Sequence, residues 1–317
     1  MLDCLIIGGG PAGLITSVYL GRFRRDVRVI DAGGSRAALI PTSHNYPGWP
    51  DGISGRELLV RLREQSRRYG ATLTAGKVDQ LVRLESGTFE ARAGTETLEA
   101  RTVVIATGAM DVEPNLPNIK AAIRSGLVRH CPICDGYEVI GKTVAVIGRG
   151  LKGVNEARFI RHYTDKLTLF TLDTAGEIGQ AERALLDAAG IAIVDEALAE
   201  VCTEGGAIVG LQTRSGKTYR FDTLYSALGC HVRSELARSV GAACDDVGQI
   251  VVDERLRTTV PDLYVVGDVA NDLNQIVVGA GHAALAATTI HNAFRVGTLL
   301  EPTSQEFVGL ACDKLLI

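Results

Sequence analysis

Residues 3–13 read DCLIIGGGPAG, an apolar run of strand-forming residues that leads into a glycine-rich turn. The glycines have Gly-x-Gly-x-x-Gly spacing, which is typical of the turn between the first strand and first helix of a dinucleotide-binding unit. In such a turn Gly8 permits the tight bend, Gly10 lets the backbone approach a pyrophosphate, and Gly13 lets helix and strand pack closely. The helix N-terminus also favours anionic phosphates. This stretch therefore predicts a nucleotide site.

An acidic residue follows this turn at the distance expected of a ribose-binding carboxylate. Residues 26–31, DVRVID, are predicted to form the next strand, and Asp31 stands 18 residues after Gly13. In dinucleotide-binding units a carboxylate about 20 residues beyond the glycines binds a ribose hydroxyl. Residues 101–108, RTVVIATG, are predicted to form a later buried strand that ends in a tight turn.

A second copy of the pattern occurs further along the chain. Residues 143–153, TVAVIGRGLKG, again join an apolar run to a Gly-x-Gly-x-x-Gly turn, and residues 167–172 are predicted to form the strand that follows. Two copies predict an α/β fold with two Rossmann-like nucleotide-binding domains, each built on a mostly parallel sheet covered by helices. Strand and helix signals at 262–268 and 279–296 continue the first domain, so the second is expected to be inserted in the first.

The length of 317 residues exceeds the roughly 250 at which a single hydrophobic core tends to split. Proline and charge in residues 110–118 indicate a crossing between domains. We expect the first domain in residues 1–116 and 244–297, the second in residues 117–243, and a C-terminal tail in residues 298–317. The tail contains Phe307 and Cys312, and it either covers a site or frays.

Charge and cysteine content restrict the partners and the compartment. The net charge of -4 provides no broad basic surface for nucleic acid, and no apolar run approaches the roughly 18 residues of a membrane span. The seven cysteines are scattered and odd in number, unlike the disulfide framework of a small secreted domain. We therefore expect a soluble, cytoplasmic protein that contacts neither nucleic acid nor membrane.

Two of these cysteines form a close pair within residues 131–138, CPICDGYE. The pair has three interpretations: half of a zinc site, a buried structural pair, or a dithiol that cycles with a disulfide. Structural zinc sites normally have four ligands, and the sequence has no second close pair, so no metal site is expected. The spacing favours redox chemistry at Cys131 and Cys134, with Asp135 as a neighbouring group that gives or takes the proton.

The order of these motifs resembles that of low-molecular-weight thioredoxin reductases and their flavoprotein relatives over nearly the whole chain. Besides the glycine turn and the cysteine pair, the resemblance includes residues 44–48 (HNYPG), 106–108 (ATG) and 267–269 (GDV), with Gln275 downstream. It implies a homodimer that binds FAD in the first domain. It also implies that Cys134 faces the flavin, that Cys131 exchanges with a substrate disulfide, and that Asp135 is the acid/base.

The resemblance further implies a set of cofactor contacts in the first domain. Asp268 is expected near the ribityl chain of the flavin, and Asn45 and Gln275 near the flavin or that chain. Taken alone, Asp268 could instead cap a turn and Asn45 could stabilise a Pro-Gly loop. His282 and His291 are assigned to helix packing or the surface. The full set of expected cofactor contacts is Gly8, Gly10, Pro11, Ala12, Gly13, Asp31, Asn45, Thr107, Gly108, Gly267, Asp268, Gln275 and Ile276.

The second glycine turn departs from the family pattern. Relatives that use NADPH have Gly-x-Gly-x-x-Ala and a basic cluster after the next strand, because a 2′-phosphate needs arginines. Here residues 169–174 read LFTLDT, without a basic residue. Asp173 suits a free ribose hydroxyl and repels a phosphate, and Arg149 either contacts a pyrophosphate or fills its place. NADPH is therefore disfavoured. The predicted second nucleotide site consists of Gly148, Arg149, Gly150, Gly153 and Asp173.

The sequence is compatible with several electron donors or acceptors. NADH is compatible with Asp173, and the altered turn is compatible with a pyridine-nucleotide-independent enzyme that resembles the ferredoxin-linked or diflavin members, the latter with a second flavin. A dithiol oxidase that uses oxygen, an NADH- or NADPH-dependent thioredoxin reductase, and a non-catalytic flavin redox sensor are further alternatives. We favour the pyridine-nucleotide-independent group. The expected partners are a thioredoxin-like protein or a small-molecule disulfide or dithiol, with ferredoxin or another electron donor.

Overall fold

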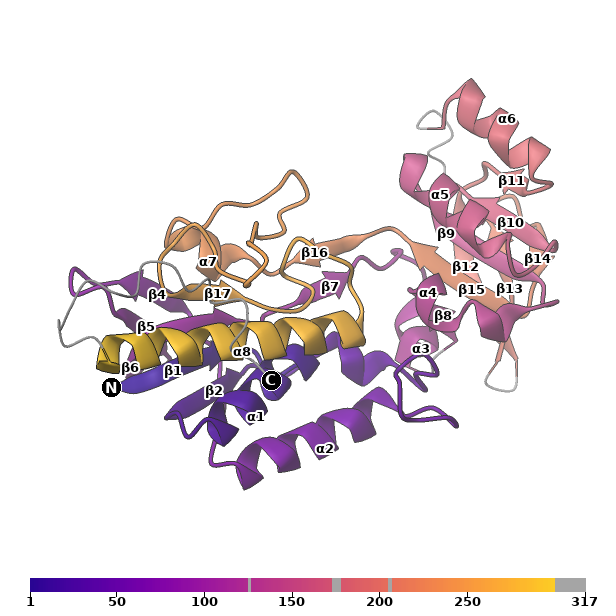
Figure 1. Cartoon of the computed structure of the whole chain (residues 1–317). Helices are drawn as coiled ribbons and strands as arrows, with labels where there is room; N and C mark the ends of the chain where they lie inside the picture. The colour runs from indigo at the N-terminus through magenta and orange to yellow at the C-terminus, as the bar shows by residue number, and fades with distance from the viewer. Residues whose placement is uncertain (125–126, 173–177, 205–206, 300–317) are drawn as a thin grey trace.

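The computed structural model describes residues 1–124, 127–172, 178–204 and 207–299. Asp173 and the predicted tail from residue 300 onward lie outside these described residues. Figure 1 shows two groups of strands and helices, joined by two extended segments near the middle of the molecule. Within the described part of the chain, no helix combines the length and apolar character that crossing a membrane requires.

The first sheet contains seven strands in the order β3-β2-β1-β6-β5-β4, with β17 paired to β6. β1, β2, β3, β6 and β17 pair in parallel, whereas β4 with β5, and β5 with β6, pair antiparallel. The strands are β1 (Leu2–Ile7), β2 (Val27–Asp31), β3 (Thr72–Ala75), β4 (Gln80–Arg83), β5 (Phe89–Ala93), β6 (Glu96–Ile105) and β17 (Leu263–Val265).

The register of this sheet brings the ends of four strands to one edge. Ile7 lies opposite Ile30 of β2 and Ile105 of β6, and Val265 of β17 also lies opposite Ile105. Open parallel sheets bind ligands beyond the carboxyl ends of their strands. Turns that are far apart in the sequence therefore line the same edge of the sheet.

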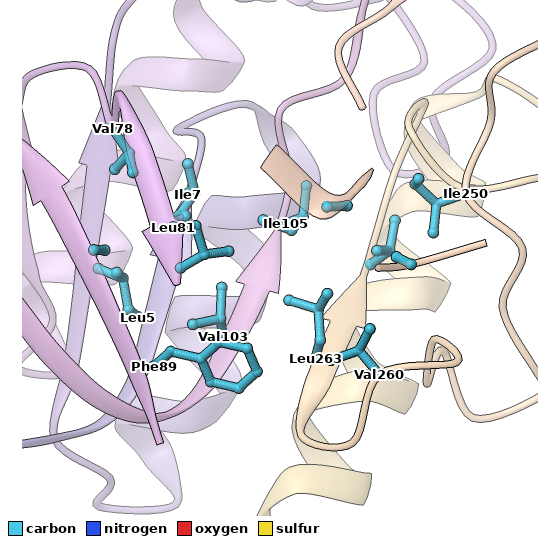
Figure 2. Packing of buried hydrophobic residues seen from close by; sticks show 14 of the residues in the cluster. Leu5, Ile7, Val78, Leu81, Phe89, Val103, Ile105, Ile250, Val260 and Leu263 are labelled. Carbon is cyan, nitrogen blue, oxygen red and sulfur yellow. The ribbon is translucent and has the colours of Figure 1, made fainter. Parts of the chain in front are cut away.

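Both faces of the central strands are buried. Along β1, Leu5 and Ile7 pack into one cluster, and Cys4 and Ile6 pack into the cluster on the other face. Figure 2 shows the first cluster, in which Phe89 and further aliphatic side chains from β6 and β17 meet β1. Double-sided burial explains why the sequence of β1 is apolar throughout rather than alternating.

Helices α1 (Pro11–Arg22), α2 (Gly55–Arg68), α8 (Ile276–Leu299) and the shorter α7 (Glu235–Ser239) lie near this sheet (Figure 1). The 3-10 turn η1 (Arg36–Leu39) contacts α2. Pro11 at the first position suits the start of α1 because proline has no N–H to leave unpaired. Ser54 caps α2 by accepting a hydrogen bond from the backbone N–H of Glu57. α8 is longer at both ends than the predicted 279–296.

The second sheet is fully parallel, with the order β11-β10-β9-β15-β8. Leu172 has a φ of 55° and turns the chain soon after β10, so this strand ends before the predicted residue 172. The strands of the second sheet are β8 (Val128–Arg129), β9 (Val144–Gly148), β10 (Leu167–Phe170), β11 (Ala192–Val194) and β15 (Thr223–Ala227). The helical elements of this half are α3 (Ile119–Arg124), α4 (Pro132–Asp135), η2 (Tyr137–Val139), α5 (Gly150–Ile160) and α6 (Gln180–Ala188). A three-stranded antiparallel sheet adds β12 (Leu198–Glu204), β13 (Ala207–Thr213) and β14 (Thr218–Arg220).

The two segments that join the halves pair with each other. β7 (Ala109–Asp111) and β16 (Cys230–Val232) form an antiparallel ribbon, visible between the two halves in Figure 1. The strands of the second sheet all lie between this outgoing and this returning segment. The α/β fold with two Rossmann-like units, the second inserted in the first, is therefore confirmed. The domain boundaries themselves stay a prediction.

Candidate active site

One cavity of about 970 Å³ connects the first glycine turn with the cysteine pair. Its lining includes the turns that follow β1, β6 and β17, and the segment that leads into α8. Cys131, Cys134 and Asp135 line the same cavity, although they belong to the other half of the molecule. Ligand sites commonly have volumes of about 300–1,000 Å³, so this cavity is large enough for a dinucleotide.

The first glycine turn has the shape that close approach of backbone requires. Gly8 has a φ of 116°, and a Cβ there would overlap the carbonyl oxygen of Ala106. A Cβ at Gly13 would overlap the carbonyl oxygen of Gly8, so helix α1 meets the turn without room for a side chain. Gly8 and Gly10 line the cavity directly, at the N-terminus of α1. This cradle fits the pyrophosphate of a dinucleotide such as FAD.

The expected ribose ligand lies at the edge of the same cavity. Asp31 accepts a hydrogen bond from the backbone N–H of Gly33 at 2.9 Å, and its other carboxylate oxygen lies 3.3 Å from Arg63. A Cβ at Gly9 would overlap the carboxylate of Asp31, so the Asp31 side chain can occupy this position only because residue 9 is a glycine. These contacts hold the carboxylate at the turn, where a ribose hydroxyl can reach it.

An ion-pair cluster that no sequence motif predicts also lines the cavity. Arg36 donates to both carboxylate oxygens of Asp111 at 2.8 and 2.6 Å, and it lies 3.2 Å from Asp268. Burial disfavours the charged guanidinium, but the hydrogen bonds and charges of the two carboxylates outweigh this effect and raise the pKa of Arg36. The predicted contact Asp268 is thus tied to the ribbon strand β7 rather than merely capping a turn.

The turn that carries Asp268 is held against α1 and α8. Gly267 has a φ of 75°, and a Cβ there would come within 2.9 Å of the Ala12 side chain. The N–H of Gly267 donates to Nδ1 of His282 at 3.3 Å, and Nε2 of that buried histidine lies 3.1 Å from Asp272. His282 therefore supports the site from α8, whereas His291 stacks on Phe23 away from it.

The cysteine pair forms a disulfide at the start of α4. The backbone N–H of Cys134 lies 3.2 Å from Sγ of Cys131, and Nε2 of Gln275 lies 3.3 Å from the same sulfur and 3.5 Å from Sγ of Cys134. Asn45 donates to Oε1 of Gln275 at 2.9 Å. Of the two residues expected near the flavin, Gln275 thus contacts the disulfide and Asn45 contacts Gln275. Thr107, Gly108 and Ile276 line the cavity nearby.

Asp135 is held by two partners. Its Oδ1 accepts a hydrogen bond from the hydroxyl of Tyr225 at 2.6 Å, and its Oδ2 lies 2.9 Å from Arg129. Burial raises the pKa of Asp135, and this effect outweighs the opposing charge of Arg129 and the hydrogen bond from Tyr225. A carboxyl group that holds its proton more readily than usual suits an acid/base beside a cysteine pair.

The first prediction concerns this carboxyl group. Tyr225→Phe removes a hydrogen bond that stabilises the ionised form of Asp135, so the pKa of Asp135 rises further. In the pH profile of kcat/KM for thiol–disulfide exchange, we expect the limb that reports Asp135 to move to higher pH, and Asp135→Asn to remove that limb. Tyr219→Phe is the matched control, because Tyr219 packs on Phe170 away from the cavity. An unshifted limb in Tyr225→Phe would contradict the acid/base role.

Two further ionisable groups, one next to Cys131 in the sequence and one on α5, have raised pKa values. His130 lies 3.2 Å from Glu113, and although burial disfavours its charged form, the carboxylates of Glu113 and Asp111 raise the pKa of His130. Burial also raises the pKa of Glu156 on α5 to about 7, with Lys152 and His130 among the opposing charges. Oε1 of Glu156 is buried and has no hydrogen-bond partner among the described residues.

The second glycine turn keeps its packing function. A Cβ at Gly148 would come within 2.5 Å of Gly153, so strand β9 and helix α5 touch through these two residues. Gly150 has a φ of 49°, and Arg149 is an exposed residue at the N-cap of α5. Asp173 lies outside the described residues. Close packing of Gly148 and Gly153, and the positive φ of Gly150, therefore explain these three glycines whether or not a nucleotide binds at the second turn.

Sequence reasoning missed the residues that connect distant segments. Arg36, Asp111, Arg129 and Tyr225 hold the predicted site residues, yet none belongs to a recognised motif. Arg36 and Asp268 are separated by 232 positions and Asp135 and Tyr225 by 90. The one local signal is His130, which stands next to Cys131 in the sequence and contacts Glu113.

The fold and this site define an oxidoreductase whose disulfide faces a dinucleotide-sized cavity. The family model of the pyridine nucleotide-disulphide oxidoreductases matches residues 2–284, and the chain belongs to this family. It is an FAD-dependent disulfide oxidoreductase of the thioredoxin reductase-like type.

Individual relatives agree with this assignment. The thioredoxin reductase of Listeria monocytogenes is 29% identical over 296 residues, which cover 90% of this chain and 91% of that protein. The crystal structure of HlmI has a TM-score of 0.88 and 26% identity, covering 94% of this chain and 93% of that one. The thioredoxin reductase of Streptococcus pyogenes MGAS5005 has a TM-score of 0.86 and 25% identity, covering 93% and 99%.

Proposed function

We propose that this enzyme exchanges electrons between FAD and the Cys131–Cys134 pair, and between that pair and an external dithiol or disulfide, without using NADPH. The observation that carries the proposal is the charge around the second nucleotide position. Residues 167–190 contain one basic side chain, Arg183, against four acidic ones. A 2′-phosphate needs several arginines or lysines at this position.

The single cation at this position already has a partner. Arg183 lies 2.8 Å from Asp195, and this hydrogen bond lowers the pKa of Asp195. A 2′-phosphate would have to compete with a carboxylate for the same guanidinium. Nζ of Lys152, on α5, lies close to Gly229, which follows the end of β15: a Cβ added at Gly229 would meet it at 2.9 Å. A dinucleotide on this sheet would extend over the same strand end.

The external exchange balances in electrons and bonds. A thiolate of the external dithiol attacks the protein disulfide, the Cys131–Cys134 bond breaks, and the second external thiol then closes a disulfide in the external molecule. The protein pair has then gained two electrons, and Asp135 accepts or donates the proton. The same steps run in reverse with an external disulfide. FAD, when bound, supplies the two-electron acceptor or donor for this pair.

The residues of the first half fit FAD by the shape of the glycine cradle. Gly8 and Gly10 would hold its pyrophosphate, Asp31 its ribose, and Asp268 its ribityl chain. For the external substrate, the relatives named thioredoxin reductase favour a thioredoxin-like protein. Ferredoxin, or a second flavin at the altered turn, are candidate electron partners within the same proposal.

Anaerobic mixing tests the electron partner directly. The oxidised holoenzyme is mixed with dithiothreitol, NADH or NADPH at equal concentration while the flavin absorbance is followed. Because this chain has no cluster of arginines to bind the 2′-phosphate, bleaching by NADPH should be at least about 100-fold slower than bleaching by dithiothreitol. The variant lacking both cysteines is the control, since it removes the dithiol route and leaves the glycine turns unchanged. Rapid bleaching of the unchanged enzyme by NADPH would refute the proposal.

A further inference from the structure

The amide of Gln275 is the side chain that touches both sulfurs of the disulfide. Its Nε2 lies 3.3 Å from Sγ of Cys131 and 3.5 Å from Sγ of Cys134. Gln275 immediately precedes α8 in the first half of the molecule, whereas the cysteines belong to α4 in the second. The contact therefore links the reacting sulfurs to the half that contains the first glycine turn.

Neighbouring side chains fix which end of this amide faces the sulfurs. Asn45 donates from Nδ2 to Oε1 of Gln275 at 2.9 Å, so Oε1 is engaged as an acceptor. The hydroxyl of Ser43, which is buried, donates in turn to Oδ1 of Asn45 at 3.1 Å. Because Asn45 presents an N–H group to Oε1 of Gln275, the N–H groups of the glutamine are free to face the sulfurs. Oε1 lies 3.8 Å from Sγ of Cys134, farther than Nε2 lies from either sulfur.

The charged groups near the disulfide are committed to other partners. Asp135 is held by Arg129 and Tyr225, and His130 lies against Glu113. Among the described residues, the other hydrogen-bond donor to a sulfur of this disulfide is the backbone N–H of Cys134, 3.2 Å from Sγ of Cys131. Gln275 is thus the side-chain donor available to the charge that develops when the disulfide opens.

We infer that Gln275 is a catalytic residue that stabilises the thiolate formed when the Cys131–Cys134 bond breaks, with Asn45 as the positioning residue that orients its amide. A hydrogen bond to a charged form favours that form, and a stabilised thiolate favours the reduced pair. This role rests on the dithiol chemistry of the proposed function but not on the identity of the electron donor.

The geometry also distinguishes the two sulfurs. Sγ of Cys131 has two donors, from Gln275 and from the backbone of Cys134, whereas Sγ of Cys134 has one. Cys131 should therefore carry most of the thiolate in the reduced pair. A thiolate on Cys131 is the nucleophile that exchange with an external disulfide requires.

The test compares Gln275→Leu with Gln249→Leu, which makes the same chemical change at an amide that contacts Asn274 instead of the sulfurs. The reduced proteins, with FAD and after its removal, are alkylated at pH 7, and the two cysteines are followed separately by mass spectrometry. Gln275→Leu should slow alkylation of Cys131 about tenfold, and of Cys134 less, because the thiolate loses its side-chain donor. Gln249→Leu should match the unchanged protein.

Equilibration with glutathione buffers provides a second readout without turnover. The equilibrium constant for reduction should fall about tenfold in Gln275→Leu, equivalent to about 30 mV for two electrons. Asn45→Asp should shift it in the same direction, because a carboxylate there accepts from the glutamine and turns its N–H groups away from the sulfurs. Retained alkylation rates and an unshifted equilibrium in both folded variants would overturn the inference. Neither measurement uses NADPH, so failure of the proposed electron route is detected separately.

Discussion

Replacing Cys134 with serine is expected to lower thiol–disulfide turnover by about 10³-fold or more, because a hydroxyl cannot form the disulfide through which the electrons pass. Cys134 lines the cavity together with the first glycine turn, and it is covalently joined to Cys131. The measurement is the rate of anaerobic flavin bleaching by dithiothreitol in the purified variant. The bound FAD content should remain unchanged, since the cradle for FAD lies in the other half.

Cys244→Ser is the matched control for this prediction. Cys244 is an exposed free cysteine outside the cavity lining, so its replacement should leave the bleaching rate unchanged. Cys131→Ser should lose turnover as completely as Cys134→Ser, because either change removes the protein disulfide. Turnover within about tenfold of the unchanged protein in Cys134→Ser would show that electrons reach the flavin without this pair.

Replacing Gly8 with alanine is expected to abolish FAD binding and to lower the free energy of unfolding by about 4 kcal/mol, since it combines backbone strain with steric overlap. Gly8 has a φ of 116°, which disfavours any residue with a Cβ, and the added methyl group would overlap the carbonyl oxygen of Ala106. Either the strand β1 or the loop after β6 must move. The measurements are bound FAD per chain and urea unfolding.

Gly94→Ala separates the two causes. Gly94 also has a positive φ, 60°, but a Cβ there would meet nothing within 4 Å. This variant should lose only about 1 kcal/mol of stability from backbone strain and keep its FAD. Equal losses of stability in the two variants would mean that the close approach of Ala106 to Gly8 is not what requires a glycine.

The predictable part of the fold came from short segments. Residues 3–13 and 143–153 each encode a strand, a turn and the start of a helix within one stretch, and both appear in the structure as β1 with α1 and β9 with α5. Such segments are readable because the glycine positions follow from backbone geometry among neighbouring residues. The cysteine pair is readable for the same reason, since three residues of separation already allow a disulfide.

Parts of the predicted site depended on information that short segments lack. Asn45 and Gln275 were expected near a flavin, but the contact between them joins positions 230 residues apart, and the contact of Gln275 with Cys131 joins positions 144 residues apart. Such contacts depend on strand register and on how the two halves pack, neither of which leaves a local pattern. The partners of Asp135 were missed because Tyr225 looks like an ordinary buried aromatic residue in strand β15.

The sequence by itself therefore determined two Rossmann-type units, one close cysteine pair, and a second glycine turn that no basic cluster follows. The tertiary structure alone decided what surrounds the sulfurs and what holds Asp268. Arg36 meets Asp111 and Asp268 because the ends of β7, β17 and η1 converge on one cavity. Glycine turns are specified by backbone sterics between neighbouring residues, whereas the contacts of Arg36 with Asp111 and Asp268, and of Gln275 with the sulfurs, arise only when distant segments meet at the same edge of the sheet.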